Sequence, residues 1–167
     1  MTLKDVARPG LKWLGRKLPA FLFKHIYAGG DLERDIHLLF EAPDPATVFL
    51  PGDLQAPSLE FCVEVLNASP YLDVRVGATH CFLTAHSNQV VGNVFAQFSR
   101  WDKRVLLRGG TMLIRIDFWL NEFQLAIVQK YIRGEAWVTA SVTVWVESKI
   151  GHIHSSRSFR LGKPHIG

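Results

Sequence analysis

Residues 135–147 alternate strictly between small or β-branched apolar side chains and polar or aromatic ones. Successive side chains of a β strand point to opposite faces, so this period of two predicts an extended strand with one buried face. A helix would spread both sets over its whole surface. The apolar set is Ala136, Val138, Ala140, Val142, Val144 and Val146, and the opposite set is Trp137, Thr139, Ser141, Thr143 and Trp145.

Further apolar runs of strand length precede and follow this segment, and turn-forming residues separate them. The turn candidates are Ser87-Asn88 and Arg108-Gly109-Gly110, and Gly92 is a candidate bulge. Neighbouring runs should therefore pair as hairpins. The predicted strands are residues 59–66, 72–84, 89–98, 111–120 and 152–161.

One helix interrupts the strands at residues 121–133. Asn121 followed three residues later by Gln124 matches a reciprocal helix N-cap, and Gly134 is well placed to end the helix. The spacing of Phe123, Ile127 and Tyr131 gives a helical apolar face.

These elements predict a mostly β fold: an antiparallel β-sandwich over residues 59–167 with one inserted helix. The chain has 167 residues, 48% hydrophobic and 20% charged, which fits one globular domain with an extension and argues against wholesale disorder. Residues 31–58 are rich in proline and predict connecting chain, with a short strand or helical turn near residues 36–40 and 47–50. Residues 1–30 form a separate arm with two short helical pieces, because Pro9 and Pro19 divide it.

The strand ending in Asn67-Ala68-Ser69-Pro70-Tyr71, the hairpin, the strand at 111–120, the helix at 121–133 and the last long hairpin together resemble a known domain. This is the water-stress and hypersensitive-response domain of the β-rich late embryogenesis abundant proteins, and the resemblance covers residues 59–159. It implies a sandwich of immunoglobulin or fibronectin type, a role in stress tolerance and no catalytic site. Some relatives are tethered to membranes and are proposed to handle lipids.

The arm carries most of the charge asymmetry. Residues 1–30 hold six basic residues against Asp5 alone, a charge of +5, whereas the whole chain carries +4. Basic residues mixed with aromatic ones predict attachment to an anionic membrane surface or docking into a protein complex, with lipid as a further ligand. The nearly neutral body offers no basic stripe for nucleic acid. The predicted binding residues of the arm are Lys12, Trp13, Arg16, Lys17, Phe21, Phe23 and Lys24.

The sequence has neither a secretory signal nor an apolar run long enough to span a membrane, so we expect a soluble or peripheral protein on the cytoplasmic side. Cys62 and Cys81 fall in apolar runs, which favours buried thiols, with a disulfide as the alternative.

No pattern of residues predicts catalysis, a metal or a cofactor. His152 and His154 share one strand face, but two imidazoles do not define a metal site. Trp137 and Trp145 lie opposite the valines, where they either meet a partner or are covered by the helix or the arm. The sequence therefore predicts a non-catalytic binding or structural module, held at a membrane surface or in a membrane-bound complex by its arm. A soluble stress-protective protein or a lipid-binding module is the alternative.

Overall fold

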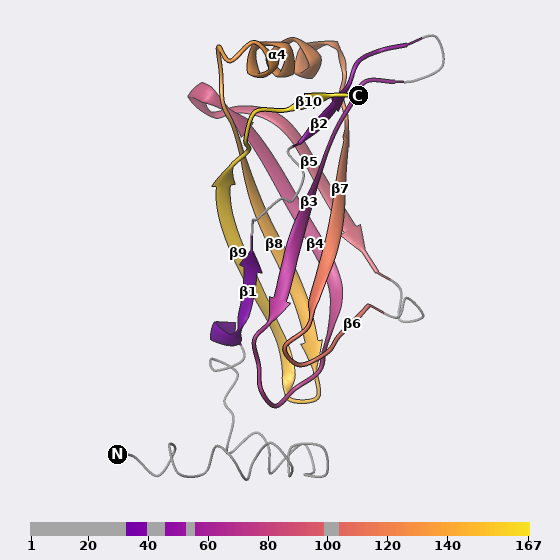
Figure 1. Cartoon of the computed structure of the whole chain (residues 1–167), viewed down its shortest axis with the longest axis vertical. Coiled ribbons are helices and arrows are strands. Elements are labelled where there is room, and N and C mark those ends of the chain that lie inside the picture. The colour runs from indigo at the N-terminus through magenta and orange to yellow at the C-terminus, as the bar shows by residue number, and fades with distance from the viewer. Residues whose placement is uncertain (1–32, 40–45, 53–55, 99–103) are drawn as a thin grey trace.

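The computed structural model describes residues 33–39, 46–52, 56–98 and 104–167 (Figure 1). Within these residues the chain is mostly β, with two five-stranded sheets and helix α4 (Glu122–Ile132). The first sheet contains β1 (Ile36–Leu39), β2 (Thr47–Phe49), β3 (Ser58–Asn67), β7 (Thr111–Trp119) and β10 (His165–Ile166). The second contains β4 (Val74–Ala85), β5 (Gln89–Gln97), β6 (Val105–Leu106), β8 (Val138–Ser148) and β9 (Gly151–Arg160).

The first sheet is organised around β3. Strand β7 pairs antiparallel with the length of β3, from the Ser58–Trp119 pair to the Leu66–Thr111 pair. Strands β1 and β2 pair with β3 as well, and β10 adds to β2. Both β1 and β2 belong to the segment expected to connect arm and domain, and the strand alternative at these two positions is confirmed. The sheet therefore includes strands that precede residue 59.

The second sheet has β4 and β8 at its centre. Strand β5 pairs with residues 78–85 of β4, and the two-residue β6 pairs with Val74 and Arg75 at the start of β4. Strand β8 pairs with β4 on its other side, and β9 pairs with β8 in a long hairpin. The register of β4 and β5 shifts between Leu83 and Thr84, because Leu83 faces Gly92 while Thr84 faces Val90. This bulge lies next to the glycine predicted to make one.

One core receives apolar side chains from both sheets. The predicted alternation is confirmed along β8, where the alanine and valine side chains from Val138 to Val146 are buried. The helix adds Ile127, Val128 and Tyr131 to the same core. Other core residues are Leu59, Phe61, Val63 and Val65 of β3, Cys81 and Leu83 of β4, and Ile114, Ile116 and Phe118 of β7.

The predicted helix cap is confirmed in detail. The Asn121 side chain accepts from the Gln124 amide at 2.9 Å, and the Gln124 side chain accepts from the Asn121 amide at 2.8 Å. Gly134 follows the helix with φ of +76°, a backbone conformation that glycine adopts without steric cost. The helix lies across one end of the two sheets (Figure 1).

Asn67 joins three segments at the end of β3. Its side chain is fully buried and donates to the carbonyls of Leu72 and Leu106 at 2.8 and 3.1 Å, while its oxygen accepts from the Ser69 amide at 3.1 Å. The residue that opens the Asn67-Ala68-Ser69-Pro70 motif therefore has a structural role. It supplies partners to backbone groups that burial would otherwise leave unpaired.

Two expectations need correction. The sandwich was expected to be antiparallel, but β10 runs parallel to β2. The short strands β6 and β10 were not predicted, because two residues carry no detectable period. The arm at residues 1–30 lies outside the described residues, and its two helical pieces stay a prediction.

Candidate interaction face

The outer face of the second sheet consists of the side chains of β4, β5, β8 and β9 that point away from the core. It combines aromatic rings with hydroxyl, amide and imidazole groups. Its residues are His80, Phe82 and Thr84 of β4, Asn93 and Phe95 of β5, Thr139, Ser141, Thr143 and Trp145 of β8, and His152, His154, Ser156, Ser158 and Arg160 of β9.

An aromatic cluster of Phe95, His80 and Trp145 occupies one part of this face. The Phe95 and Trp145 rings meet edge to face with centroids 6.0 Å apart, and His80 lies 6.4 Å from Phe95 and 6.5 Å from Trp145. His80 Nε2 lies 2.5 Å from Asn93 Oδ1, which fixes the imidazole. Phe95 is still 60% exposed and Trp145 38% exposed. The cluster therefore presents pre-ordered aromatic surface to the solvent.

A second group surrounds Trp137, just before β8. The His86 ring meets Trp137 at 4.0 Å, and the Arg160 guanidinium lies 4.8 Å from the indole ring. Trp137 remains 41% exposed. Since eight residues of strand separate Trp137 from Trp145, the two groups lie roughly 26 Å apart along the sheet.

Hydroxyl pairs occupy the surface between the two aromatic groups. Ser141 faces Ser158 and Thr143 faces Ser156, with 2.8 Å between the oxygens in each pair. These cross-strand bonds hold β8 and β9 in register and leave lone pairs and protons for a ligand.

Trp145 therefore lies on this face and Trp137 extends it just before β8, and both lie on the side opposite the valines as predicted. Helix α4 lies across the end of the sheets and leaves both rings partly exposed. Coverage by the arm stays a prediction, because the arm residues from Lys12 to Lys24 lie outside the described residues.

Sequence reasoning missed Phe95 and the position of His80 beside it. The bulge puts Val91 and Gly92 both on the buried side, so Phe95 faces outward although it has the same parity as buried Val91. A fixed period of two across residues 89–98 places Phe95 on the wrong face. The glycine at position 92 was the available signal.

The thiol and imidazole groups of the described residues form no common site. Cys81 points into the core, where burial raises its pKa to about 12, whereas His80 points outward on the same strand. His152 and His154 lie exposed on β9. Among the residues that the structure describes, no cluster of three or more His, Cys, Asp or Glu side chains could hold a metal ion. Both cysteines are thiols, Cys81 buried and Cys62 half-buried.

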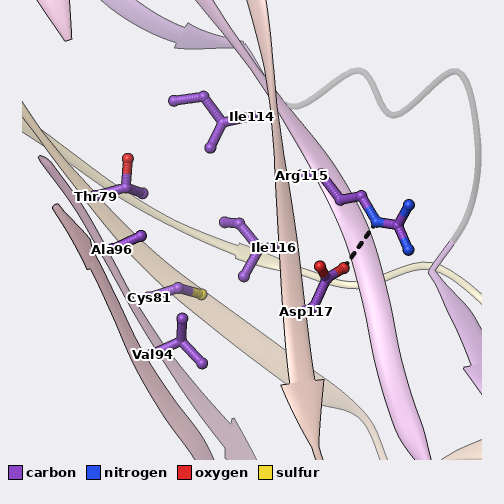
Figure 2. A pocket seen from close by; sticks show the side chains of 8 residues that line it. All are labelled: Thr79, Cys81, Val94, Ala96, Ile114, Arg115, Ile116 and Asp117. Carbon is purple, nitrogen blue, oxygen red and sulfur yellow. Dashed lines mark hydrogen bonds and ion pairs between the residues drawn. The ribbon is translucent and has the colours of Figure 1, made fainter. Parts of the chain in front are cut away.

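A small cleft of about 160 Å³ opens between β4 and β5 of one sheet and β7 of the other (Figure 2). Its wall is mainly apolar, and the Arg115–Asp117 ion pair lies on β7 beside it. The buried Thr79 hydroxyl has no hydrogen-bond partner. The lining residues are Thr79, Cys81, Val94, Ala96, Ile114, Arg115, Ile116 and Asp117.

No protein-family model and no curated protein matches the chain. Solved structures do match it. The Northeast Structural Genomics Consortium target SoR45 has a TM-score of 0.52 at 10% identity, over 77% of this chain and 86% of the target. A structural genomics target from Bordetella pertussis has a TM-score of 0.45 at 15% identity, over 76% and 87% of the two chains. The Arabidopsis thaliana protein AT1g01470 has a TM-score of 0.41 at 12% identity, over 77% and 87%.

The match to target SoR45 shows a shared mostly β fold and extends no further than the fold. Within the described part of the chain, no helix combines the length and apolar character needed to cross a bilayer.

Proposed function

We propose that this protein is a non-catalytic binding module. The outer face of its second sheet holds a protein partner, and its basic arm attaches it to a membrane surface or a membrane-bound complex. The observation that carries the proposal is the pre-ordered cluster of Phe95, His80 and Trp145, whose two large rings stay partly exposed. Exposed aromatic side chains with few rotamers give contact area at low entropic cost, and they are enriched at protein interfaces.

The proposal includes the type of fold. Two sheets with a common core and Asn67 at the end of β3 support a sandwich of immunoglobulin or fibronectin type, as the resemblance to the water-stress and hypersensitive-response domain implies. A soluble stress-protective role is the alternative under that resemblance.

The partner-binding part is tested in the full-length chain by the double variant Phe95→Ser/Trp145→Ser. Affinity-tagged protein is extracted gently from its source cells and sized. We expect the double variant to elute in a smaller complex than wild type, because it keeps only the attachment through its arm. Phe123→Ser is the matched control, because Phe123 is a 66% exposed aromatic residue on α4, outside this face. Elution of the double variant at the same size as wild type would contradict the proposal.

The arm is tested on vesicles that contain anionic phosphatidylserine. Arg16→Gln/Lys17→Gln removes two charges from the arm, and Lys130→Gln/Lys163→Gln removes two exposed charges from the body. Each cation near an anionic surface contributes about 1 kcal/mol, so the arm variant should bind roughly 30-fold more weakly while the body variant changes little. Negligible vesicle binding by wild type would exclude the membrane-surface form and leave docking into a complex.

A second candidate function, binding of a small apolar ligand, is favoured by the cleft and its unpartnered Thr79 hydroxyl. The cleft has a volume of about 160 Å³, similar to the volume of about 150 Å³ of an engineered apolar cavity that binds benzene. The cleft therefore suits a small ring or a short chain better than a whole lipid. An apolar fluorescent probe should bind wild type and lose affinity in Ala96→Leu, which narrows the cleft. Equal probe binding by both proteins would exclude this function.

A further inference from the structure

Strand β7 is a long edge of the first sheet, as β5 and β9 are the two edges of the second sheet. No described strand pairs with β7 on the side away from β3. The edge strand β5 is interrupted by its bulge, and a serine hydroxyl of β9 bonds to the carbonyl of Ile36 in β1. Over its nine residues, β7 contains no proline, no lysine and no register shift. Such an edge is a template for pairing with another strand.

The backbone pattern shows which residues of β7 face outward along this edge. The Leu120 amide donates to the carbonyl of Pro57, and the Asn67 amide donates to the carbonyl of Gly110. Even-numbered residues of β7 therefore direct their backbone groups toward β3. Since the backbone groups of consecutive residues point to opposite sides, the odd-numbered residues direct theirs toward the open edge.

The same odd-numbered residues carry the side chains on the outer face of the first sheet. Leu113 is 57% exposed and Trp119 is 70% exposed, at the two ends of the strand. Between them, the Arg115 guanidinium donates to Asp117 at 2.9 Å and to Glu60 at 2.5 Å. The order along the edge is apolar, positive, negative, apolar.

This order is self-complementary when two copies of β7 run antiparallel about Ile116. Arg115 then faces Asp117 of the second copy, and Leu113 faces Trp119 of the second copy. Both pairs join odd-numbered residues, as hydrogen bonding across the edge requires, so each pair can exchange two backbone bonds. A two-fold axis at Arg115 would oppose two arginines, and one at Asp117 would oppose two aspartates, which is destabilising.

We propose that β7 pairs with β7 of a second copy of this chain in that register, so that the two first sheets become one continuous sheet across a two-fold axis. The contact is isologous, because the same patch serves both copies. Each Asp117 then lies between two guanidinium groups, its own Arg115 and that of the second copy. The cleft beside Ile114 and Ile116 adjoins this edge, so the second copy covers one side of it.

The contact should be weak, with a dissociation constant on the order of 100 µM, because one strand edge is smaller than a standard interface. The mass of the full-length protein is therefore measured by sedimentation equilibrium from about 10 µM to about 500 µM, a range that brackets such an affinity. Wild type is expected to change from 18.9 kDa to twice that mass.

Two charge variants test the register. In a dimer of Arg115→Asp, aspartate faces aspartate at both places where positions 115 and 117 meet. In a dimer of Asp117→Arg, arginine faces arginine at both places. Each variant alone should therefore dimerise at least about tenfold more weakly. An equimolar mixture restores both opposite-charge pairs in a heterodimer and should dimerise about as well as wild type. Glu64→Arg, on β3 and one strand away from the edge, is the matched control and should dimerise normally.

Thermal unfolding by circular dichroism shows whether the variants are folded. Recovery of the dimer on mixing is independent evidence of folding, because unfolded variants would not pair through β7. A wild type that stays monomeric at all concentrations overturns the proposal. So does a dimer that neither charge variant weakens, or a mixture that associates no better than the separate variants.

Discussion

Gly92 is packed so tightly that a single methyl group should destabilise the fold measurably. A Cβ atom at this position would lie 2.4 Å from Cδ1 and 2.9 Å from Cε1 of Phe118, well inside van der Waals contact. Phe118 is buried and its ring lies parallel to that of Phe61 with centroids 6.2 Å apart, so the ring has little room to retreat. In Gly92→Ala either the β5 bulge or the Phe118 ring must move.

The size of the effect follows from two opposing contributions. Overpacking a buried site costs about 1–3 kcal/mol, and replacing glycine by alanine returns about 0.4–1 kcal/mol by restricting the unfolded chain. The midpoints of the two ranges give a net loss of about 1.3 kcal/mol in the free energy of unfolding, and we expect a value of about 0.5–2.5 kcal/mol because the nearest contacts of 2.4 and 2.9 Å lie well inside van der Waals distance. For a domain of this size the melting temperature falls by about 2–4 °C per kcal/mol, so the expected decrease is about 1–10 °C.

The assay is urea and thermal unfolding of four proteins: wild type, Gly92→Ala, Phe118→Val and the double variant. Valine has no δ or ε carbon, the atoms of Phe118 that the new methyl group would meet, so the double variant should be at least about 1 kcal/mol more stable than additive losses predict. Gly162→Ala is the control, because no heavy atom lies within 4 Å of its added Cβ, and its stability should change by less than about 0.5 kcal/mol. Additive losses in the cycle would refute the packing argument.

Three further predictions concern stability. Asn67→Ala leaves two buried carbonyls without their side-chain donor and should cost about 2–4 kcal/mol by urea unfolding, whereas exposed Gln97→Ala should change little. Asn121→Ala removes the helix cap and should cost about 1 kcal/mol, and a cost near zero would mean that the cap does not stabilise the helix. Burial raises the pKa of Cys81 from 9.0 to about 12 and that of Tyr131 from 10.0 to about 12. The unfolded chain therefore loses these protons first, so their contribution to stability is complete below about pH 9 and is lost as pH rises to about 12. The pH dependence of unfolding should flatten in Cys81→Ala and Tyr131→Phe, and an unchanged slope would exclude these groups as its source.

Elements that depend on neighbours in the chain could be predicted from the sequence. The cap of α4 uses Asn121 and Gln124, three residues apart, and both of its hydrogen bonds are present. Strand β8 follows its alternation closely, because buried valines on one face and half-buried hydroxyl residues on the other fix which face turns inward. These patterns correctly placed Trp137 and Trp145 on the outer face.

Features that depend on a distant partner could not be predicted. Strands β6 and β10 exist because β4 and β2 pair with them, and two residues alone carry no strand pattern. The bulge in β5 reverses the parity of the strand, and only its pairing with β4 shows where the reversal occurs.

The sequence by itself determined the mostly β character of this protein, its helix and the two outward tryptophans, because short-range periodicity and capping dictate them. The tertiary structure decided that Trp145 meets Phe95, a residue some fifty positions earlier in the chain, and that Arg115 bonds Glu60 across β3 and β7. It also decided which edge of the first sheet stays open. The physical reason is that strand pairing joins residues far apart in sequence, and a sheet edge is defined only by the strands that are paired elsewhere.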